Sequence, residues 1–333
     1  MPDKEKIKID ALYPSYLNTY RDGTLKKIAD FTLKMLESCR ICPRKCKVNR
    51  LNGQTGFCKT ALKPVVYSHL PHHGEEPPIS GSRGSGTIFF SGCNCACVYC
   101  QNYEFSQKIE GEALDFEKLA DYMLKLQALG CHNINLVTPT HIMPQILNAL
   151  LLAIPKGLNI PLVYNTSGYE LPEMIKLLDG IVDIYLADMR YADDKMAEIF
   201  SSAPDYVKLN RESIIQMHKQ TGTARFDDNG IMEKGLIIRH LVLPDNISGT
   251  EETMKFIAEH VSKDTFISLM SQYTPFHRAA SFKQISRRLK QEEYESAQSA
   301  MEKYGLHNGW IQEAGGLDRF AGENIKSGFK EEK

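Results

Sequence analysis

The distribution of cysteines restricts what this chain can fold into more than any other feature of the sequence. Eight of the nine cysteines lie between Cys39 and Cys100, and Cys131 is the ninth. Clustered thiols in a reducing cytosol indicate metal ligation more than disulfides, and an odd total argues against a complete disulfide framework. We therefore expect bound metal to organise this part of the chain.

Composition and charge exclude several classes of protein. Forty basic and 41 acidic residues give a net charge of −1, which indicates no nucleic-acid partner and no anionic membrane. Apolar stretches such as Ile146–Ile154 are far shorter than the roughly 20 residues of a membrane span. The first residues lack the apolar region of a signal peptide. We therefore expect a soluble, cytoplasmic protein.

From residue 87 onward, short apolar runs alternate with helical stretches, which predicts a parallel sheet. The predicted strands are Thr87–Ser91, Ile134–Val137, Pro161–Asn165, Ile184–Asp188, Gly235–Leu243 and Phe266–Met270. The predicted helices are Phe116–Leu129, Met143–Leu152, Glu170–Leu178, Met196–Lys219, Gly249–Val261 and residues 291–304. Six units are fewer than the eight of a closed TIM barrel. The expected fold class is therefore α/β, a partial (βα)6 TIM-like barrel with an N-terminal cysteine-rich metal-binding segment.

Three regions are expected along the chain. Residues 1–86 contain an amphipathic helix over residues 23–38, followed by a cysteine-rich segment that reads as largely irregular. Residues 87–320 form the partial barrel, and residues 321–333 form a polar tail.

The central cysteine motif follows the first predicted barrel strand. Residues 92–102 read GCNCACVYCQN, and Cys93, Cys97 and Cys100 have C-x3-C-x2-C spacing. Thiolates suit iron–sulfur clusters or zinc, and α/β folds place active sites at the carboxyl ends of their strands. Three ligands leave one iron of a [4Fe–4S] cluster open, so a substrate amine and carboxylate can chelate it. The alternative is a zinc knuckle with Cys95 as fourth ligand; we interpret Cys95 as a packing thiol.

This spacing, after a strand that ends in Ser-Gly, resembles the radical SAM superfamily, as does Tyr99 before the last cysteine. The resemblance implies that the open iron binds the methionine moiety of S-adenosylmethionine (SAM). An electron from the cluster then cleaves the S–C5′ bond, and the 5′-deoxyadenosyl radical abstracts a hydrogen atom from the substrate. The implied cofactors are the [4Fe–4S] cluster and SAM, and the implied electron donor is of the flavodoxin or ferredoxin type.

Polar residues after the second predicted strand stand where many radical SAM enzymes carry Gly-Gly-Glu. Residues 135–141 read NLVTPTH here, so Thr138, Thr140 and His141 are candidate contacts to SAM. Thr-Pro-Thr is also good turn chemistry, and a capped strand end is the alternative.

The ends of the third and fourth predicted strands resemble those of glycyl-radical activating enzymes. Residues 164–169 read YNTSGY and residues 187–190 read ADMR. The resemblance implies that Asp188 helps to bind a monovalent cation and that Arg190, in place of Lys, contacts the SAM carboxylate. Asn165 replaces an acid there. A helix N-cap is the alternative role for Asp188.

Two further candidates lie on the fifth strand and after the sixth. Arg239 stands among apolar residues, where burial is costly unless the charge is paired; the resemblance implies contact with the SAM ribose or carboxylate, and a structural ion pair is the alternative. His277 follows QYTPF and resembles the histidine that touches adenosine, or it is a surface residue.

A second cysteine group lies in residues 39–58, which read CRICPRKCKVNRLNGQTGFC. Four thiols in twenty residues indicate a closed metal site for an auxiliary [4Fe–4S] cluster or zinc. The alternative is free buried thiols. The ligands expected are Cys39, Cys42, Cys46 and Cys58.

The 39–58 segment resembles the PflX group of homologues of pyruvate formate-lyase activating enzyme, together with HHGEEPP at residues 72–78, GSGTIFF at 84–90 and NLVTPT. The resemblance implies a possible glycyl radical enzyme or other protein substrate. The alternatives are modification of a small molecule or other macromolecule, and a non-catalytic iron–sulfur electron-transfer protein. The histidines and acids of residues 72–76 could bind a metal or a substrate, or form an ordered connector.

Overall fold

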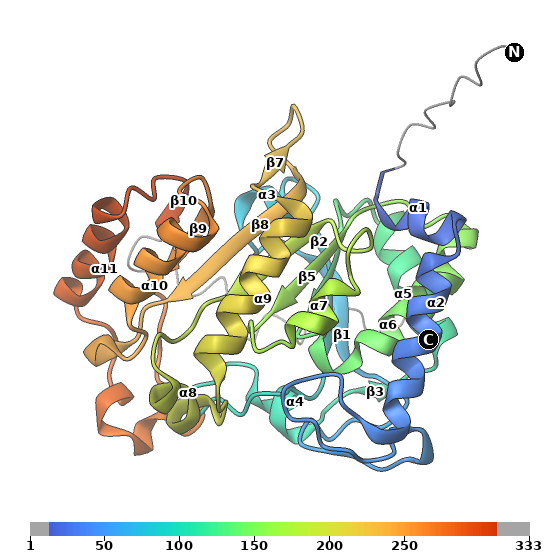
Figure 1. Cartoon of the computed structure of the whole chain (residues 1–333), viewed down its shortest axis with the longest axis horizontal. Helices are drawn as coiled ribbons and strands as arrows, with labels where there is room; N and C mark the ends of the chain where they lie inside the picture. The colour runs from blue at the N-terminus through green and yellow to red at the C-terminus, as the bar shows by residue number, and fades with distance from the viewer. Residues whose placement is uncertain (1–12, 312–333) are drawn as a thin grey trace, which may run out of the picture.

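The strands of this protein form one sheet in a computed structural model that describes residues 13–311 (Figure 1). The strands are β1 (Val65–His72), β2 (Ser85–Phe90), β3 (Glu112–Ala113), β4 (Ile134–Val137), β5 (Leu162–Thr166), β6 (Ile184–Asp188), β7 (Arg225–Phe226), β8 (Met232–Leu241), β9 (Phe266–Met270) and β10 (Gly309–Ile311). Their order is β10-β9-β8-β6-β5-β4-β2-β1-β3, with β7 paired to β8. The strands from β2 to β10 along this order run parallel, whereas β1 is antiparallel to β2 and β3 is antiparallel to β1.

Helices surround the sheet in Figure 1. They are α1 (Tyr16–Arg21), α2 (Thr24–Lys34), α3 (Pro77–Ser80), α4 (Tyr103–Lys108), α5 (Phe116–Ala128), α6 (Met143–Ala153), α7 (Pro172–Lys176), α8 (Asp194–Ser201), α9 (Tyr206–Thr221), α10 (Thr250–Phe256) and α11 (Gln291–Lys303). The N-terminal helix α2 packs against α6, which in turn packs against α5. Among residues 13–311, no helix combines the length and apolar character needed to cross a membrane.

The sheet curves into an open barrel. Six parallel strands contribute side chains to one pocket, and these are Phe89, Val137, Asn165, Asp188, Arg239 and Met270. Because successive side chains of a strand point to opposite faces, one shared pocket means that the same face of each strand turns inward. The end strands β10 and β3 do not pair with each other, so the barrel is partial. The predicted α/β fold class is confirmed.

Three of the predicted strands, β4, β6 and β9, begin and end at the predicted residues. They are short and largely buried, as strands covered on both faces are. The structure adds β10 as a further parallel strand beside β9. Its sequence, Gly-Trp-Ile, is too short to show a period.

The segment between the two cysteine groups is more regular than the sequence predicted. Residues 65–72 form β1, which pairs with β2 from Val66 opposite Phe90 to His72 opposite Ser85. The prediction of a largely irregular segment was wrong here, because Pro71 and two histidines mask a strand that has one neighbour on each side. The expected boundary at residue 86 therefore falls inside β2, which pairs with β1 in the same sheet.

The helix predicted over residues 196–219 is two helices, α8 and α9. Ser202 and Asp205 have left-handed backbone angles, with φ of 51° and 54°. Pro204 lies between them; it has no N–H to donate and disfavours helical geometry at the preceding residue. The apolar pattern continues across the break, which is why periodicity alone predicted one helix. The expected tail at 321–333 lies outside the described residues.

The short helix α3 closes one end of the barrel. Because β1 runs antiparallel to β2, the chain after His72 emerges at the amino ends of the parallel strands. Ile79 of α3 is fully buried there among interior side chains that include Val163, Ile184 and Ile237. Residues 74–80 therefore form a floor under the lumen, opposite the end that carries the cysteine loop.

Replacing the floor residue Ile79 by Ala tests this packing. We expect Ile79→Ala to lower the free energy of unfolding by about 2–5 kcal/mol, because it removes buried apolar atoms and leaves a cavity. Urea denaturation followed by circular dichroism measures the change. Ile199→Ala in α8 is the matched control, since Ile199 is 42% exposed. An equal, small effect of both substitutions would contradict the role of α3.

Candidate active site

The central cysteine loop, residues 92–102, is held in place by the end of α8. The Ala96 N–H donates to the carbonyl of Ser201 and the Val98 N–H to the carbonyl of Phe200, each at 2.9 Å. Carbonyls in the last turn of a helix have no partner within the helix. The break after Ser201 therefore supplies the acceptors that fix the cysteine loop.

Cys97 is the thiol most closely surrounded by donors. Its Sγ accepts hydrogen bonds from Arg190 Nη1 at 3.1 Å and from Ser201 Oγ at 3.0 Å. Hydrogen bonding with the Cys95 thiol and burial raise the pKa of Cys97 well above its ordinary value, and Arg190 acts in the opposite direction. A metal displaces such a proton, so the two donors would then face a thiolate. The surroundings of Cys97 fit a cluster ligand.

The two outer thiols of the motif also have polar partners. Cys93 Sγ accepts from the Cys95 N–H at 3.3 Å, and Cys100 Sγ lies 3.3 Å from Ser106 Oγ. The Cys95 thiol lies 3.8 Å from the hydroxyl of Ser167, on β5's side of the loop, and also interacts with its cysteine neighbours. The role of Cys95 as a packing thiol therefore stays a prediction.

A pocket of about 950 Å³ adjoins this loop. Gln101 and Asn102, which directly follow Cys100, line it. Arg190, whose guanidinium also contacts Cys97, lines it as well. A ligand in the lumen can thus reach the side chains that surround the cysteine loop.

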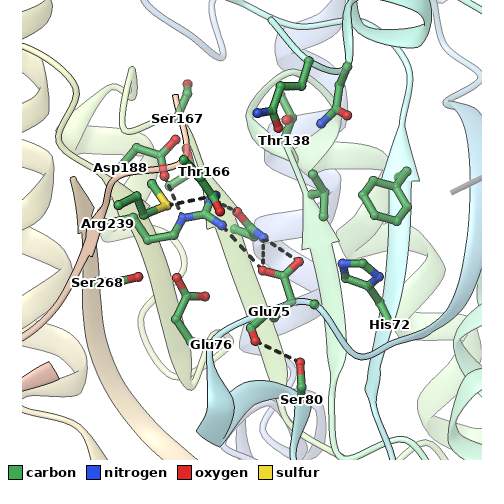
Figure 2. A pocket seen from close by; sticks show the side chains of 18 of the residues that line it. His72, Glu75, Glu76, Ser80, Thr138, Thr166, Ser167, Asp188, Arg239 and Ser268 are labelled. Atoms are coloured by element: carbon green, nitrogen blue, oxygen red, sulfur yellow. Dashed lines mark hydrogen bonds and ion pairs between the residues drawn. The ribbon is translucent and has the colours of Figure 1, made fainter. Parts of the chain in front are cut away.

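A layer of ion pairs crosses the lumen below the loop (Figure 2). Asp188 accepts from Arg190 Nε at 2.9 Å and Nη2 at 2.5 Å, and its other oxygen accepts from Arg239 Nε at 2.8 Å. Arg239 also donates to Asn165 Oδ1 at 2.5 Å and lies 3.5 Å from a Glu75 oxygen. The predicted alternative of a structural ion pair therefore describes Arg239 as it stands in the structure without ligand.

Asp188 stays ionised in this layer. Burial raises its pKa, but Arg239 and Arg190 outweigh burial and hold the pKa below its ordinary value. The alternative role of Asp188 as a helix N-cap is wrong, because α8 is capped by Asp193, whose carboxylate accepts from the N–H of Lys195 at 2.7 Å and of Met196 at 3.1 Å.

Eight residues were candidates for the cofactor-binding site, and five of them line the pocket, namely Thr138, Asn165, Asp188, Arg190 and Arg239. The other three do not line it. Tyr99 is buried with its hydroxyl 2.6 Å from that of Tyr191. Thr140 is buried and donates to Glu170 at 2.5 Å. His277 is exposed and stacks on Tyr103, with ring centroids 4.5 Å apart.

The pocket also contains residues that were not among the predicted cofactor-binding residues. Glu75 and Glu76 project from the floor, and Ser268 and Trp310 line the wall. The motif HHGEEPP contains Glu75 and Glu76 and was noted in the sequence. The sequence does not show, however, that the antiparallel strand β1 places these two acids beneath the lumen. Trp310 lies on the short β10, which gave no signal.

The four N-terminal cysteines line one small cavity together, and they are Cys39, Cys42, Cys46 and Cys58. Arg44, Arg50 and His141 line the same cavity. Arg50 is 1% exposed and donates to the His141 carbonyl at 2.6 Å. The His141 ring, neutral because burial lowers its pKa to about 4, places Nε2 2.9 Å from the carbonyl of Ser91.

This cavity adjoins the central cysteine loop. Gly92 has φ of +85°, and a Cβ atom there would lie 2.5 Å from the main-chain oxygen of Cys58. Arg44 Nε donates to the Asn94 carbonyl at 2.8 Å. Only glycine permits so close an approach of two backbones. The two cysteine groups are therefore neighbours in space.

Neither cysteine group has the geometry of an assembled metal site in the described residues. Within residues 13–311, no set of three or more His, Cys, Asp and Glu side chains has the arrangement of an assembled metal site.

Comparison with known proteins identifies the family. The sequence profile of the radical SAM superfamily matches residues 87–257. The chain is also 30% identical over 312 residues to an uncharacterized protein of Methanocaldococcus jannaschii, across 91% of this chain and 85% of that protein. The chain belongs to the radical SAM superfamily. Membership implies SAM and a [4Fe–4S] cluster as cofactors, as the cysteine motif predicted.

Solved structures resemble this chain only distantly. A structure of TYW1 with a lysine–pyruvate adduct bound has a TM-score of 0.45 and 12% identity, covering 68% of this chain and 76% of that one. A domain of pyruvate-formate lyase-activating enzyme from Bacteroides vulgatus has a TM-score of 0.34 and 14% identity, covering 60% and 91%.

Glu170, beneath the pocket wall, gives a pH test of the site. Burial raises its pKa to about 7, although Thr140 and Thr166 each donate to its Oε1 at 2.5 Å. The unfolded state loses this proton near pH 4.5, and the folded state near pH 7. The free energy of unfolding therefore falls across this range, by up to about 3 kcal/mol. Glu170→Gln removes that fall.

Urea denaturation at pH values from 4 to 8 measures the difference between wild type and Glu170→Gln. The exposed residue Glu173 supplies the matched control, Glu173→Gln, which keeps the wild-type pH dependence. An unchanged slope in Glu170→Gln would show that Glu170 is ionised throughout this range.

Proposed function

We propose that this protein cleaves SAM reductively and uses the resulting 5′-deoxyadenosyl radical to abstract a hydrogen atom from a substrate in the lumen. The arrangement around Cys97 carries the proposal. Its sulfur accepts from Arg190 and Ser201, and Arg190 extends from this sulfur to Asp188 inside the pocket. The Arg190 side chain therefore connects Cys97, the proposed cluster ligand, with the lumen.

Each pocket residue has a proposed role. Cys93, Cys97 and Cys100 hold the [4Fe–4S] cluster, which supplies the electron when reduced and leaves one iron for SAM. Arg190 and Arg239 bind the SAM carboxylate and ribose, since guanidinium groups pair well with carboxylates. The remaining contacts come from Thr138, Asn165 and Asp188.

Roles for Tyr99, Thr140 and His277 require movement or an indirect action. Tyr99 can position the loop through Tyr191, and Thr140 can position β5 through Glu170. His277 reaches adenosine only if its stacking on Tyr103 opens.

The proposed group within the superfamily is PflX, and one candidate activity is activation of a glycyl radical enzyme. The strand ends at residues 164–169 and 187–190 support it, since they resemble those of the activating enzymes. The proposed reductant is a flavodoxin- or ferredoxin-type protein. An activase would generate a stable radical on its partner, visible as a doublet in the electron paramagnetic resonance (EPR) spectrum.

Modification of a small molecule is the second candidate. The floor formed by residues 74–80 supports it, because the floor closes the lumen and places two acids inside it. A closed, charged lumen suits a compact substrate better than a peptide that must pass through.

The N-terminal cysteines are proposed to hold a second [4Fe–4S] cluster, with zinc as the alternative. The contact between Gly92 and Cys58 supports a cluster that exchanges electrons with the first, because it leaves only a thin layer of protein between the two groups. Zinc has no redox chemistry and would only stabilise the fold.

The first test of this function is SAM cleavage. Anaerobically reconstituted protein with dithionite and SAM is expected to form 5′-deoxyadenosine, measured by liquid chromatography. We expect Cys97→Ala to reduce the product to background, because two thiolates cannot hold the cluster. Cys131→Ala, outside both cysteine groups, is the matched control and retains the activity. Product formation by Cys97→Ala at the wild-type rate would rule out the ligand assignment.

Iron analysis tests the second site. Wild type is expected to bind about eight iron atoms and a Cys39→Ala/Cys42→Ala variant about four, as each cubane cluster holds four. In the reduced wild type, two neighbouring paramagnetic clusters broaden each other's EPR signals, and the double variant loses this broadening. About four iron atoms plus one zinc in the wild type would instead establish the zinc alternative.

A further inference from the structure

Two acids rise from the floor of the lumen into the pocket. Figure 2 shows the carboxylates of Glu75 and Glu76 between the strand that carries Ser268 and the side chain of His72. Ile79, buried beneath them, fixes the backbone from which they project. Their position is therefore set by packing, as a binding group requires.

The lumen contains more acidic groups than guanidinium groups. Asp188 is paired with both Arg190 and Arg239, so one carboxylate already serves two guanidinium groups. Glu75 and Glu76 add two further acidic groups, and burial raises the pKa of both. A cation bound beside them would favour their ionised forms and offset the cost of burial.

The two floor acids differ in how well the protein satisfies them. Glu75 interacts with Arg239 at 3.5 Å, with Asn165 at 3.4 Å and also with Asn135. Glu76 is 8% exposed and interacts with Ser268, but its Oε2 has no hydrogen-bond partner within residues 13–311. A buried carboxylate oxygen without a donor is costly, and a ligand that brings a donor removes that cost.

Apolar side chains also line the pocket. Phe89, Val137, Met270 and Trp310 line the same pocket. A complementary ligand therefore combines a charged nitrogen with a short apolar stem. The stem would extend from the floor toward the cysteine loop.

We infer that the floor acids Glu75 and Glu76 bind a primary ammonium or guanidinium group of the substrate. This inference rests on the proposed function, since it gives the substrate class for the same lumen. The cationic group is anchored at the floor, so a C–H bond on the stem faces the end of the lumen where SAM is proposed to bind.

The single tryptophan of the chain provides a direct binding assay. Trp310 lines the pocket, so its fluorescence reports occupancy of the lumen. The anaerobically reconstituted protein, with saturating SAM and no reductant, is titrated with n-butylammonium and with agmatine. The neutral and anionic comparisons are n-butanol and butyrate. Trp310→Phe identifies the part of the signal that comes from this tryptophan.

We expect saturable binding of the two cations and none of n-butanol or butyrate. Glu76→Gln is expected to lower the affinity for the two cations by about tenfold or more, because a charge-assisted hydrogen bond is lost. Glu75→Gln is also expected to lower the affinity for the two cations. Glu117→Gln in α5, which is exposed, is the matched control. Thermal melting shows that each variant is folded.

Three results would overturn the inference. They are the absence of a saturable response to either cation, an equal response to n-butanol, and unchanged cation affinity in both floor variants. Loss of amine binding specifically when SAM is added would assign the two acids to the SAM ammonium group instead. Amine binding without any SAM cleavage by wild type would disprove the proposed function and leave the cation site standing.

Discussion

The double ion pair of Asp188 connects the cysteine loop to the rest of the lumen. Arg190 contacts Cys97 on one side and Asp188 on the other. Asp188 also accepts a hydrogen bond from Arg239, which in turn donates to Asn165. Buried charges of this kind are costly unless each has partners, so the members fix one another's positions. A change of charge at the cluster would therefore act on the substrate end of the pocket through hydrogen-bonded groups.

The antiparallel direction of β1 determines which residues form the floor of the lumen. It brings residues 74–80 under the sheet, where α3 fills the floor and Glu75 and Glu76 enter the pocket. A parallel strand in that position would deliver the same residues to the opposite end. The residues proposed to bind SAM stand at the carboxyl ends of the parallel strands, whereas the floor comes from a segment outside the repeating βα units. Under the proposed function, SAM chemistry and substrate binding would therefore depend on different parts of the chain.

The sequence predicted the parts of the structure that depend on local signals. Periodicity located β4, β6 and β9 to the residue, and cysteine spacing identified the superfamily. It failed where distant residues decide the outcome. The split between α8 and α9 is stabilised because the end of α8 accepts hydrogen bonds from the cysteine loop. Thr140 follows the end of β4 as predicted. Its hydroxyl, however, donates a hydrogen bond to Glu170, which lies thirty residues further along the chain.

The placement of the N-terminal cysteines follows from the same logic. Gly92 must approach Cys58 closely, so the backbone of the second cysteine group forms part of the wall that supports the first. Arg44 then ties the N-terminal segment to both the loop and the end of α8, through the carbonyls of Asn94 and Ser202. A purely structural metal could lie anywhere that a short segment needs support. A metal bound by the N-terminal cysteines would instead lie against the turn that carries Cys93, where its charge would act on a cluster bound by that turn.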